Sequence, residues 1–301
     1  MLRRFVRYYR PHLYLFVLDM GAAVIMAGLS ILFPYLTRAL LRTYIPQRNL
    51  QAIVWILAAM AGIYTANLVL NYIRMKWGHI LGVRMETDMR RDIFRHIQKL
   101  SFSYFDNVKT GHIMSRISND LNMIAEVAHH APEDLIISLV IILGAYVFMF
   151  VFSVPLALIS LIPLPFMLVW GLLLGGKMRQ GFRKVRKEIA EINSTVENSV
   201  QGIREVKAYA NEGLEEEKFK SSNTTFRNAK EEAYSVMARF HAGIHFLRDL
   251  YYLVVVGGGV ILIFRGTVEV YDLLSFVLYI GIILPPIDRL INFNEQLQQG
   301  S

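Results

Sequence analysis

The sequence contains no cysteine among its 301 residues, which excludes disulfide bonds and thiolate metal sites. In an apolar chain this absence carries little information about the cellular compartment. The sequence also lacks the G-x-x-x-x-G-K-[ST] pattern, the loop that cradles nucleotide phosphates. A glycine triplet at 257–259 lies in an apolar stretch with no lysine behind it, and we interpret it as helix-packing material or a flexible point. We therefore expect no ATP hydrolysis by this chain alone.

Patterns of metal ligands are scarce as well. His129 and His130 are adjacent, so they cannot share one face of a helix. His241 and His245 are four residues apart, which is a weak zinc spacing, and no H-E-x-x-H motif accompanies them. The sequence therefore predicts no metal site and no cofactor bound by this chain.

Long apolar runs are the main feature that is present. Hydrophobic residues make up 54% of the chain and the mean hydropathy is +0.38, whereas soluble domains contain about 45–50% apolar residues. A membrane-spanning helix needs about 20 mostly apolar residues. The first run is longer than a signal-peptide core and lacks a nearby small-residue cleavage site, so we interpret it as a retained span. The six predicted spans are 13–33, 52–72, 135–152, 156–174, 242–264 and the shorter 273–287.

The basic residues are distributed as membrane topology predicts. The formal net charge is +8, and 27 of the 32 Lys and Arg residues lie in the N-terminal segment, in two long connections or just after the sixth span. Basic residues near spans stay on the cytoplasmic side. We therefore expect a multi-pass protein of the inner or plasma membrane, with both termini in the cytoplasm, and contacts with lipid but not with nucleic acid. The basic segments are 1–12, 73–134 and 175–241, followed by Arg289.

The two long connections read as continuations of the spans. Residues 73–100 and 177–210 contain no proline, and their apolar residues follow helical spacing. A continuous helix from residue 51 to 100 would be roughly 75 Å long at 1.5 Å per residue, and the bilayer core accounts for only about 30 Å. The predicted fold is an all-α membrane protein whose six long helices extend into the cytoplasm, as one domain over 13–299.

Residues 1–12 are predicted to form a separate amphipathic helix in the membrane interface. Four apolar residues share one helical face, arginines occupy the others, and Pro11 ends the helix. A frayed basic terminus is the alternative. The four apolar residues are Leu2, Phe5, Val6 and Tyr9.

Each of the two long connections, which we call arms, must turn back toward the membrane. Turn residues and aromatic residues occur together at both turns. The first turn, 101–118, contains Asp106 and Gly111, and the second turn, 207–219, contains Gly213. Exposed aromatic residues far from lipid favour a protein partner, although two solvated hairpins would have the same pattern. The aromatic residues are Phe102, Tyr104, Phe105, Tyr209 and Phe219.

The first turn carries a family resemblance. The stretch "LSFSYFDNVKTGHIMSRISNDLNMI" resembles the first intracellular loop in the transmembrane domain of type I ABC exporters, which have the type IV fold. The matching residues are Leu100, Ser101, Tyr104, Phe105, Asp106, Thr110, Gly111, Ser115, Arg116, Asn119 and Asp120.

The second turn is similar to the second intracellular loop of the same family. The stretch is "ENSVQGIREVKAYANEGLEEEKF", and the two matches occur in the family's order, spacing and topology. Together with the six spans, the resemblance covers the whole chain. The matching residues are Glu197, Gly202, Ile203, Val206, Lys207, Ala208, Tyr209, Glu212 and Phe219.

The resemblance implies that both turns are coupling helices. In this family they dock on a nucleotide-binding domain, which binds ATP and Mg²⁺, and a second transmembrane half completes a homodimer or heterodimer. This chain ends where the family's linker to that domain begins, and we interpret 300–301 as a cloning remnant. The residues expected to contact the nucleotide-binding domain are Tyr104, Phe105, Asp106, Thr110, Gly111, Tyr209, Asn211, Glu212 and Phe219.

Polar residues inside the spans are the candidates for a substrate cavity. Each ionisable residue there costs about 2.5–3.5 kcal/mol on insertion scales, so such residues face a bundle interior or a cavity. Ion pairs of Arg248 with Asp288, or of Asp249 with Arg289, are the structural alternative. The candidate cavity residues are Asp19, Asn67, His245, Arg248, Asp249 and Asp288.

The implied function is export of a lipid, drug or peptide-like substrate by alternating access, driven by ATP hydrolysis in the nucleotide-binding domain. Two alternatives stay open on the sequence. One is an importer of a metal chelate, because similar domains occur there. The other is a gated channel or regulatory membrane protein with the same arms.

Overall fold

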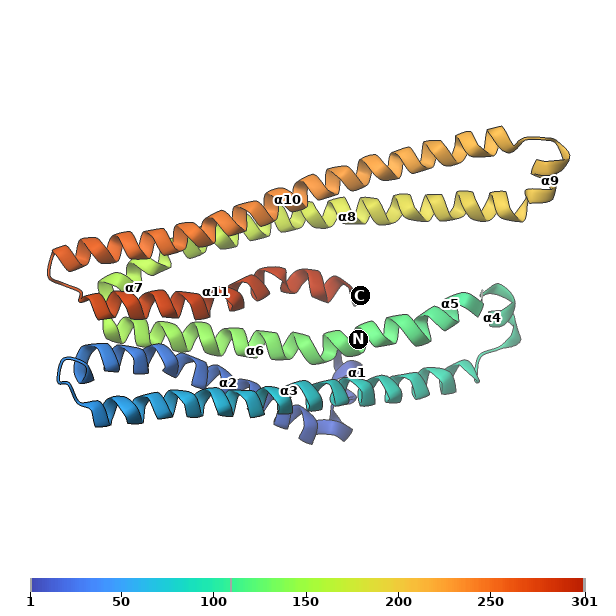
Figure 1. Cartoon of the computed structure of the whole chain (residues 1–301). Helices are drawn as coiled ribbons and strands as arrows, with labels where there is room; N and C mark the ends of the chain where they lie inside the picture. The colour runs from blue at the N-terminus through green and yellow to red at the C-terminus, as the bar shows by residue number, and fades with distance from the viewer. Residues whose placement is uncertain (1, 109, 300–301) are drawn as a thin grey trace. The chain divides into compact units, whose positions relative to one another are not determined.

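The computed structural model describes residues 2–108 and 110–299, and these residues contain helices and no strand (Figure 1). Long helices follow one another with short connections. The helices are α1 (Leu2–Arg7), α2 (Leu13–Ala39), α3 (Leu50–Ile97), α4 (Phe102–Asn107), α5 (Thr110–Ser115), α6 (Leu121–Phe152), α7 (Val154–Leu161), α8 (Pro163–Gln201), α9 (Ile203–Ala208), α10 (Glu212–Phe264) and α11 (Val270–Gln299). A 3₁₀ segment (Arg10–His12) and two π segments (Leu40–Tyr44 and Arg116–Asp120) complete the order.

Within the described residues, six helical stretches are long and apolar enough to cross a membrane. This confirms the prediction of six membrane-spanning helices in an all-α protein. The stretches run well beyond their apolar parts, and α10 alone has 53 residues, a length of about 80 Å at 1.5 Å per residue. The six stretches are Phe5–Tyr44, Leu50–Ile97, Ile113–Phe152, Val154–Gln201, Glu212–Phe264 and Val270–Ile291.

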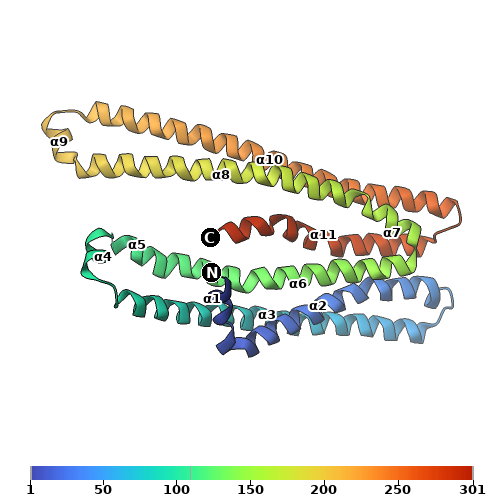
Figure 2. The ribbon, with the colours of Figure 1, turned by 180° about the vertical axis from the view of Figure 1, so that it is seen from behind.

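The chain forms two compact units. One comprises Met1–Ser160 with Val254–Ser301, and the other is Leu161–Leu253. The first unit is a bundle in which α2 packs on α3, α6 and α11, and α6 also packs on α3 and α11 (Figures 1 and 2).

Small and apolar side chains fill the interior of the first unit. Ala23 and Ala27 of α2 pack against Ile137 and Ile141 of α6. Small residues of this kind let membrane helices approach closely. Tyr279 of α11 is fully buried and its hydroxyl donates a hydrogen bond of 3.1 Å to the Ile31 carbonyl of α2. The N-terminal and C-terminal spans are therefore joined directly.

Pairs between an arginine and a carboxylate also cross helices in the described part of the first unit. Arg38 of α2 pairs with Asp272 of α11 at 2.6 Å, and Arg289 of α11 pairs with Asp134 of α6 at 3.3 Å. Arg74 of α3 pairs with Glu133 of α6, which is 1% exposed. These pairs place opposite charges together inside a bundle, where isolated charges would be costly.

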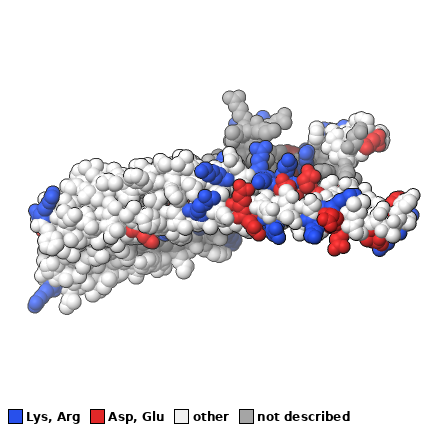
Figure 3. Space-filling view, turned by 90° about the horizontal axis from the view of Figure 1, so that it is seen from above, with Lys and Arg blue, Asp and Glu red and all other residues white. Residues whose placement is uncertain are grey.

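The second unit is a hairpin of α8 and α10 closed by α9, and both views show the two long helices side by side (Figures 1 and 2). The Trp170 Nε1–H donates a hydrogen bond of 3.3 Å to the Phe240 carbonyl. Lys184 pairs with Glu232 at 2.9 Å. Charged side chains gather toward the α9 end of this hairpin, whereas the apolar part beside them is nearly free of charge (Figure 3).

Two glycines expected to break helices lie inside them. Gly111 belongs to α5 and Gly213 to the first turn of α10. The chain reverses instead next to them, at Val108, which is extended, and at Ala210, which has a φ of 52°. An isolated glycine is tolerated within a helix, so a turn-forming residue alone does not locate the turn.

The N-terminal segment forms more than one element. α1 ends at Arg7, and Pro11 lies in the 3₁₀ segment before α2. Phe5 and Tyr9 pack against a core cluster around Leu15, with Tyr9 and Phe16 rings 5.2 Å apart. Val6 is 57% exposed, so Phe5, Val6 and Tyr9 have different surroundings, and the side chain of Leu2 lies outside the described residues.

Candidate functional site

The first turn exposes an aromatic surface. It consists of α4, preceded by Ser101 in an extended conformation and followed by the extended Val108. Phe102 is 90% exposed and Phe105 is 43% exposed. Tyr104 is half-buried and meets the Phe105 ring edge-on, with centroids 5.5 Å apart. An aromatic pair held in this way offers a preformed contact surface.

The remaining predicted residues of this turn flank the aromatic pair. Asp106 is exposed in the last turn of α4. Thr110 and Gly111 open α5, and Gly111 is exposed with open space where a side chain would stand. The side chain of Thr110 lies outside the described residues.

The second turn is a tight reversal after α9. α8 ends at Gly202, α9 follows at once, and Ala210 then adopts the left-handed conformation with a φ of 52°. The Asn211 backbone N–H donates a hydrogen bond of 3.0 Å to the Val206 carbonyl. Tyr209 is 76% exposed, so its ring projects from the reversal. A left-handed non-glycine residue is uncommon and is held here by these surrounding bonds.

Ion pairs brace the second turn. Lys207 donates a hydrogen bond of 2.7 Å to Glu212, which holds the pKa of that carboxyl below its ordinary value. Glu212 lies far before the apolar part of α10, 242–264. Phe219, which was expected within the turn, is instead a 41% exposed residue of α10. The two aromatic residues of this region are thus exposed on different elements.

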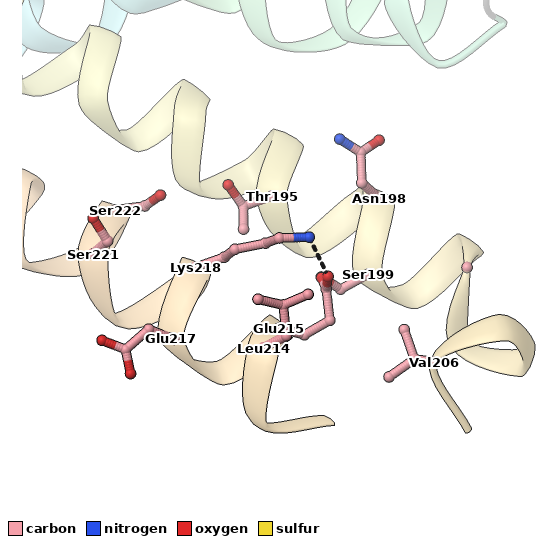
Figure 4. A pocket seen from close by; sticks show the side chains of 11 residues that line it. Thr195, Asn198, Ser199, Val206, Leu214, Glu215, Glu217, Lys218, Ser221 and Ser222 are labelled. Carbon is pink, nitrogen blue, oxygen red and sulfur yellow. Dashed lines mark hydrogen bonds and ion pairs between the residues drawn. The ribbon is translucent and has the colours of Figure 1, made fainter. Parts of the chain in front are cut away.

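A cavity of about 690 Å³ lies behind the second turn, between α8, α9 and α10 (Figure 4). Lys218 donates a hydrogen bond of 2.6 Å to Glu215, and the Ser199 hydroxyl donates a second one. These bonds lower the pKa of the Glu215 carboxyl, with the Lys218 bond as the larger cause. The other residues lining the cavity are Thr195, Asn198, Gly202, Val206, Leu214, Glu217, Ser221 and Ser222.

The Ser199–Glu215–Lys218 contact was missed by the sequence analysis. It ties α8 to the first turns of α10, so it sets how the two arms of the hairpin meet at the tip. The acidic run that opens α10 was the available signal, because acidic residues favour a helix N-terminus. Ser199, the partner on α8, belongs to no sequence motif that would have singled it out.

The predicted cavity residues fall into both units. Asp19 of α2 is fully buried in the first unit, where Asn67 and Asp288 are half-buried. In the second unit, His245 and Asp249 are exposed on α10.

Arg248 is half-buried beside them on α10. His245 and Asp249 are four residues apart and therefore share one helical face. Arg289, considered as a partner of Asp249, pairs with Asp134 of α6. The structure thus brings a polar pair onto one exposed face of α10 and uses Arg289 within the bundle.

Three potential metal ligands from two helices lie together in the structure, although the sequence predicted no metal site. His79 of α3 lies beside Glu126 and His130 of α6, and one ligand atom of each falls within 4.8 Å of the others. Histidines close in the chain have a recognisable spacing, whereas ligands from different helices have none that the sequence displays.

The comparisons with known proteins agree with the architecture. The family of ABC transporter transmembrane regions matches residues 16–287. The chain is 37% identical over 300 residues to an uncharacterized ABC transporter ATP-binding protein, YwjA, of Bacillus subtilis, a match covering 100% of this chain and 52% of that protein. It is 25% identical over 298 residues to the ATP-dependent lipid A-core flippase of Syntrophus aciditrophicus, covering 99% and 50% of the two chains.

The chain spans about half the length of the curated relatives it matches. The family match extends from the first span into the sixth and includes both turns. This multi-pass membrane protein therefore belongs to the family of ABC transporter transmembrane regions.

Proposed function

We propose that this chain is the substrate-translocating half of an ATP-driven exporter, and that its two turns receive motion from a nucleotide-binding domain. The observation that supports this most is the exposure of Phe102, Phe105 and Tyr209 at the ends of long helices. Aromatic residues are enriched where proteins dock on one another. ATP and Mg²⁺ would act on the nucleotide-binding domain.

The proposed orientation places both turns and both termini in the cytoplasm. The basic residues support it, because most of them lie in the segments that carry the turns. A continuous helix such as α3, with 48 residues, can transmit a displacement of its tip into the bilayer. Alternating access then requires a second transmembrane half, with which this chain would enclose the substrate.

The proposed substrate is a lipid or another amphiphile. Apolar spans with few charges suit such a molecule, and one relative is named a lipid A-core flippase. The candidate cavity residues would contact the polar head, with His245 and Asp249 presenting one polar face on α10. We propose export and not import of a metal chelate for the same two reasons, the low charge of the spans and the name of that relative.

The coupling proposal is tested by Phe105→Ala in a full-length protein that carries the nucleotide-binding domain. Truncating an aromatic anchor at an interface costs about 2 kcal/mol or more. We expect substrate-stimulated ATPase activity to fall by about tenfold or more, with membrane insertion unchanged.

Phe264→Ala is the matched control for this experiment. Phe264 is 89% exposed but ends α10 at the opposite end from the second turn, so its loss should leave the stimulation intact. Unchanged stimulation in the Phe105 variant would remove that residue from the coupling surface. Equal losses in both variants would show that exposed aromatics act only through folding or insertion.

The cavity proposal is tested by Asp249→Cys in a full-length protein that carries the nucleotide-binding domain, with any cysteine outside this cysteine-free chain replaced. Asp249 is exposed on α10, and we expect its thiol to react with a membrane-impermeant reagent in one nucleotide state and at least about tenfold more slowly in the other, a ratio equal to about 1.4 kcal/mol. Val255→Cys, at a fully buried position of the same helix, should stay unreactive. Absence of labelling at 249 in every state would argue against a place in the cavity.

A further inference from the structure

His79, Glu126 and His130 form a group that the proposed function does not use. The His79 ring from α3 meets the His130 ring from α6 edge-on, with centroids 5.5 Å apart. Glu126 lies one turn before His130, and its carboxylate is 3.5 Å from the His130 Nε2. We propose that these three side chains bind a divalent transition-metal ion, with Zn²⁺ as the best fit.

The types of donor atom in the group favour zinc over other divalent ions. Two imidazoles and one carboxylate are the protein ligands of zinc sites that keep a fourth position for water or another ligand. Calcium and magnesium prefer oxygen ligands only, so they fit this group poorly. Tetrahedral zinc with bonds of about 2.1 Å needs donor atoms about 3.4 Å apart. The ligand atoms lie within 4.8 Å of one another, so small side-chain rotations complete the site.

His79 is already oriented as metal-bound histidines are. Its Nδ1 is 2.7 Å from the Met75 carbonyl oxygen, which can only accept a hydrogen bond. In the neutral ring, Nδ1 therefore carries the proton, and Nε2 carries the lone pair that a metal ion needs. A backbone carbonyl holding the second ring nitrogen is the usual outer support of a histidine ligand, because it fixes the tautomer and the ring orientation.

The two helices that supply the ligands are held together on both sides of the group. Toward α4, a methyl group added at Gly82 of α3 would stand 3.4 Å from the Ala125 carbonyl of α6, so the backbones are close there. Toward the apolar spans, Arg74 of α3 pairs with Glu133 of α6. Ligands on rigid, closely packed helices hold their geometry better than ligands on loops.

The position of the site lets an ion enter from solvent, and it also determines which helices a bound ion would join. His79 follows the apolar segment 52–72, and the two α6 ligands precede 135–152, so the site lies at the boundary of the apolar part. His79 and His130 are half-buried and Glu126 is exposed, which leaves an entry from solvent. A bound ion would clamp α3 to α6, the two helices joined through the first turn. Occupancy would therefore restrain the arm that carries α4.

The test measures Zn²⁺ binding to the tag-free chain in lipid nanodiscs by titration calorimetry. The same titration with Mg²⁺ serves as the comparison. We expect one Zn²⁺ per chain and no comparable Mg²⁺ binding. Glu126→Gln and His79→Ala should each weaken Zn²⁺ binding by at least about 10–100-fold, the range that loss of even an outer support produces. His241→Ala, an exposed histidine of α10, is the matched control and should bind as the natural chain does.

Thermal unfolding supplies a second readout. An ion that binds the folded chain raises its unfolding temperature, so Zn²⁺ should raise that of the natural chain and of the His241 variant, but not that of the Glu126 variant. The glutamine keeps the size of the side chain, and its unfolding without metal shows whether it folds. Binding that is absent in the natural chain, or equal in the Glu126 variant, would reduce the group to a hydrogen-bonded ion pair and overturn the proposal.

Discussion

Replacing Arg38 with methionine is expected to lower the free energy of unfolding by about 3–5 kcal/mol, the cost of leaving a buried charge without its partner. Arg38 and Asp272 lie 2.6 Å apart, and their side chains are only 13% and 9% exposed. The guanidinium also stands 4.1 Å from the centroid of the Phe152 ring. One side chain thus joins α2, α6 and α11, and methionine would keep much of its apolar volume but none of its charge.

The second substitution Asp272→Asn isolates the electrostatic cause. In the Arg38→Met/Asp272→Asn double variant no charge is left unpaired, so we expect at least half of the lost stability to return. Lys184→Met is the matched control, because Lys184 and Glu232 form an exposed pair, 55% and 67% accessible. Pairs of this kind contribute about 0–1 kcal/mol.

These free energies can be measured by SDS-induced unfolding of the chain in mixed micelles, followed by tryptophan fluorescence. If the Arg38 variant loses no more stability than the Lys184 variant, the Arg38–Asp272 pair does not hold the bundle together. A double variant as unstable as the single one would show that packing of the arginine stem, and not the unpaired charge, carries the effect.

Replacing Gly243 with alanine is expected to destabilise the chain by about 1–3 kcal/mol, the usual cost of overpacking a tight contact. A methyl group there would stand 2.2–2.3 Å from three atoms of the Trp170 indole. A rigid ring cannot yield as the end of a flexible chain can. The indole must move, and its hydrogen bond of 3.3 Å to the Phe240 carbonyl would be lost.

Gly257→Ala in the same helix is the matched control. Nothing lies within 4 Å of a methyl group at Gly257, so the only expected change is a gain of about 1 kcal/mol from the better helix propensity of alanine. Thermal unfolding measures both variants, and the fluorescence of Trp170 serves as a local probe once Trp55 and Trp77 are replaced by phenylalanine. Equal behaviour of the two would mean that α8 and α10 do not approach closely at Gly243.

The glycine triplet is an example of a local pattern whose role the sequence alone does not decide. The sequence left two roles open for residues 257–259. In the structure, a methyl group would meet Ile159 at Gly258 and Leu273 at Gly259, at 2.9 and 2.4 Å. Two of the three glycines therefore serve helix packing, and only Gly257 faces open space. The neighbours belong to α7 and α11, and the sequence around the triplet does not state that these helices pack against it.

The sequence by itself determined the number of spans, the long helical arms and the approximate places where they turn. These features follow from the length of apolar runs, the helical spacing of apolar residues and the absence of proline in 73–100, which all act within a few turns of helix. Only the tertiary structure decided which polar groups meet. His79 with Glu126, Ser199 with Glu215 and Arg289 with Asp134 come from different helices, and their contacts depend on how those helices pack. Helix packing depends on side-chain fit along whole faces, and a single sequence does not state which faces will meet.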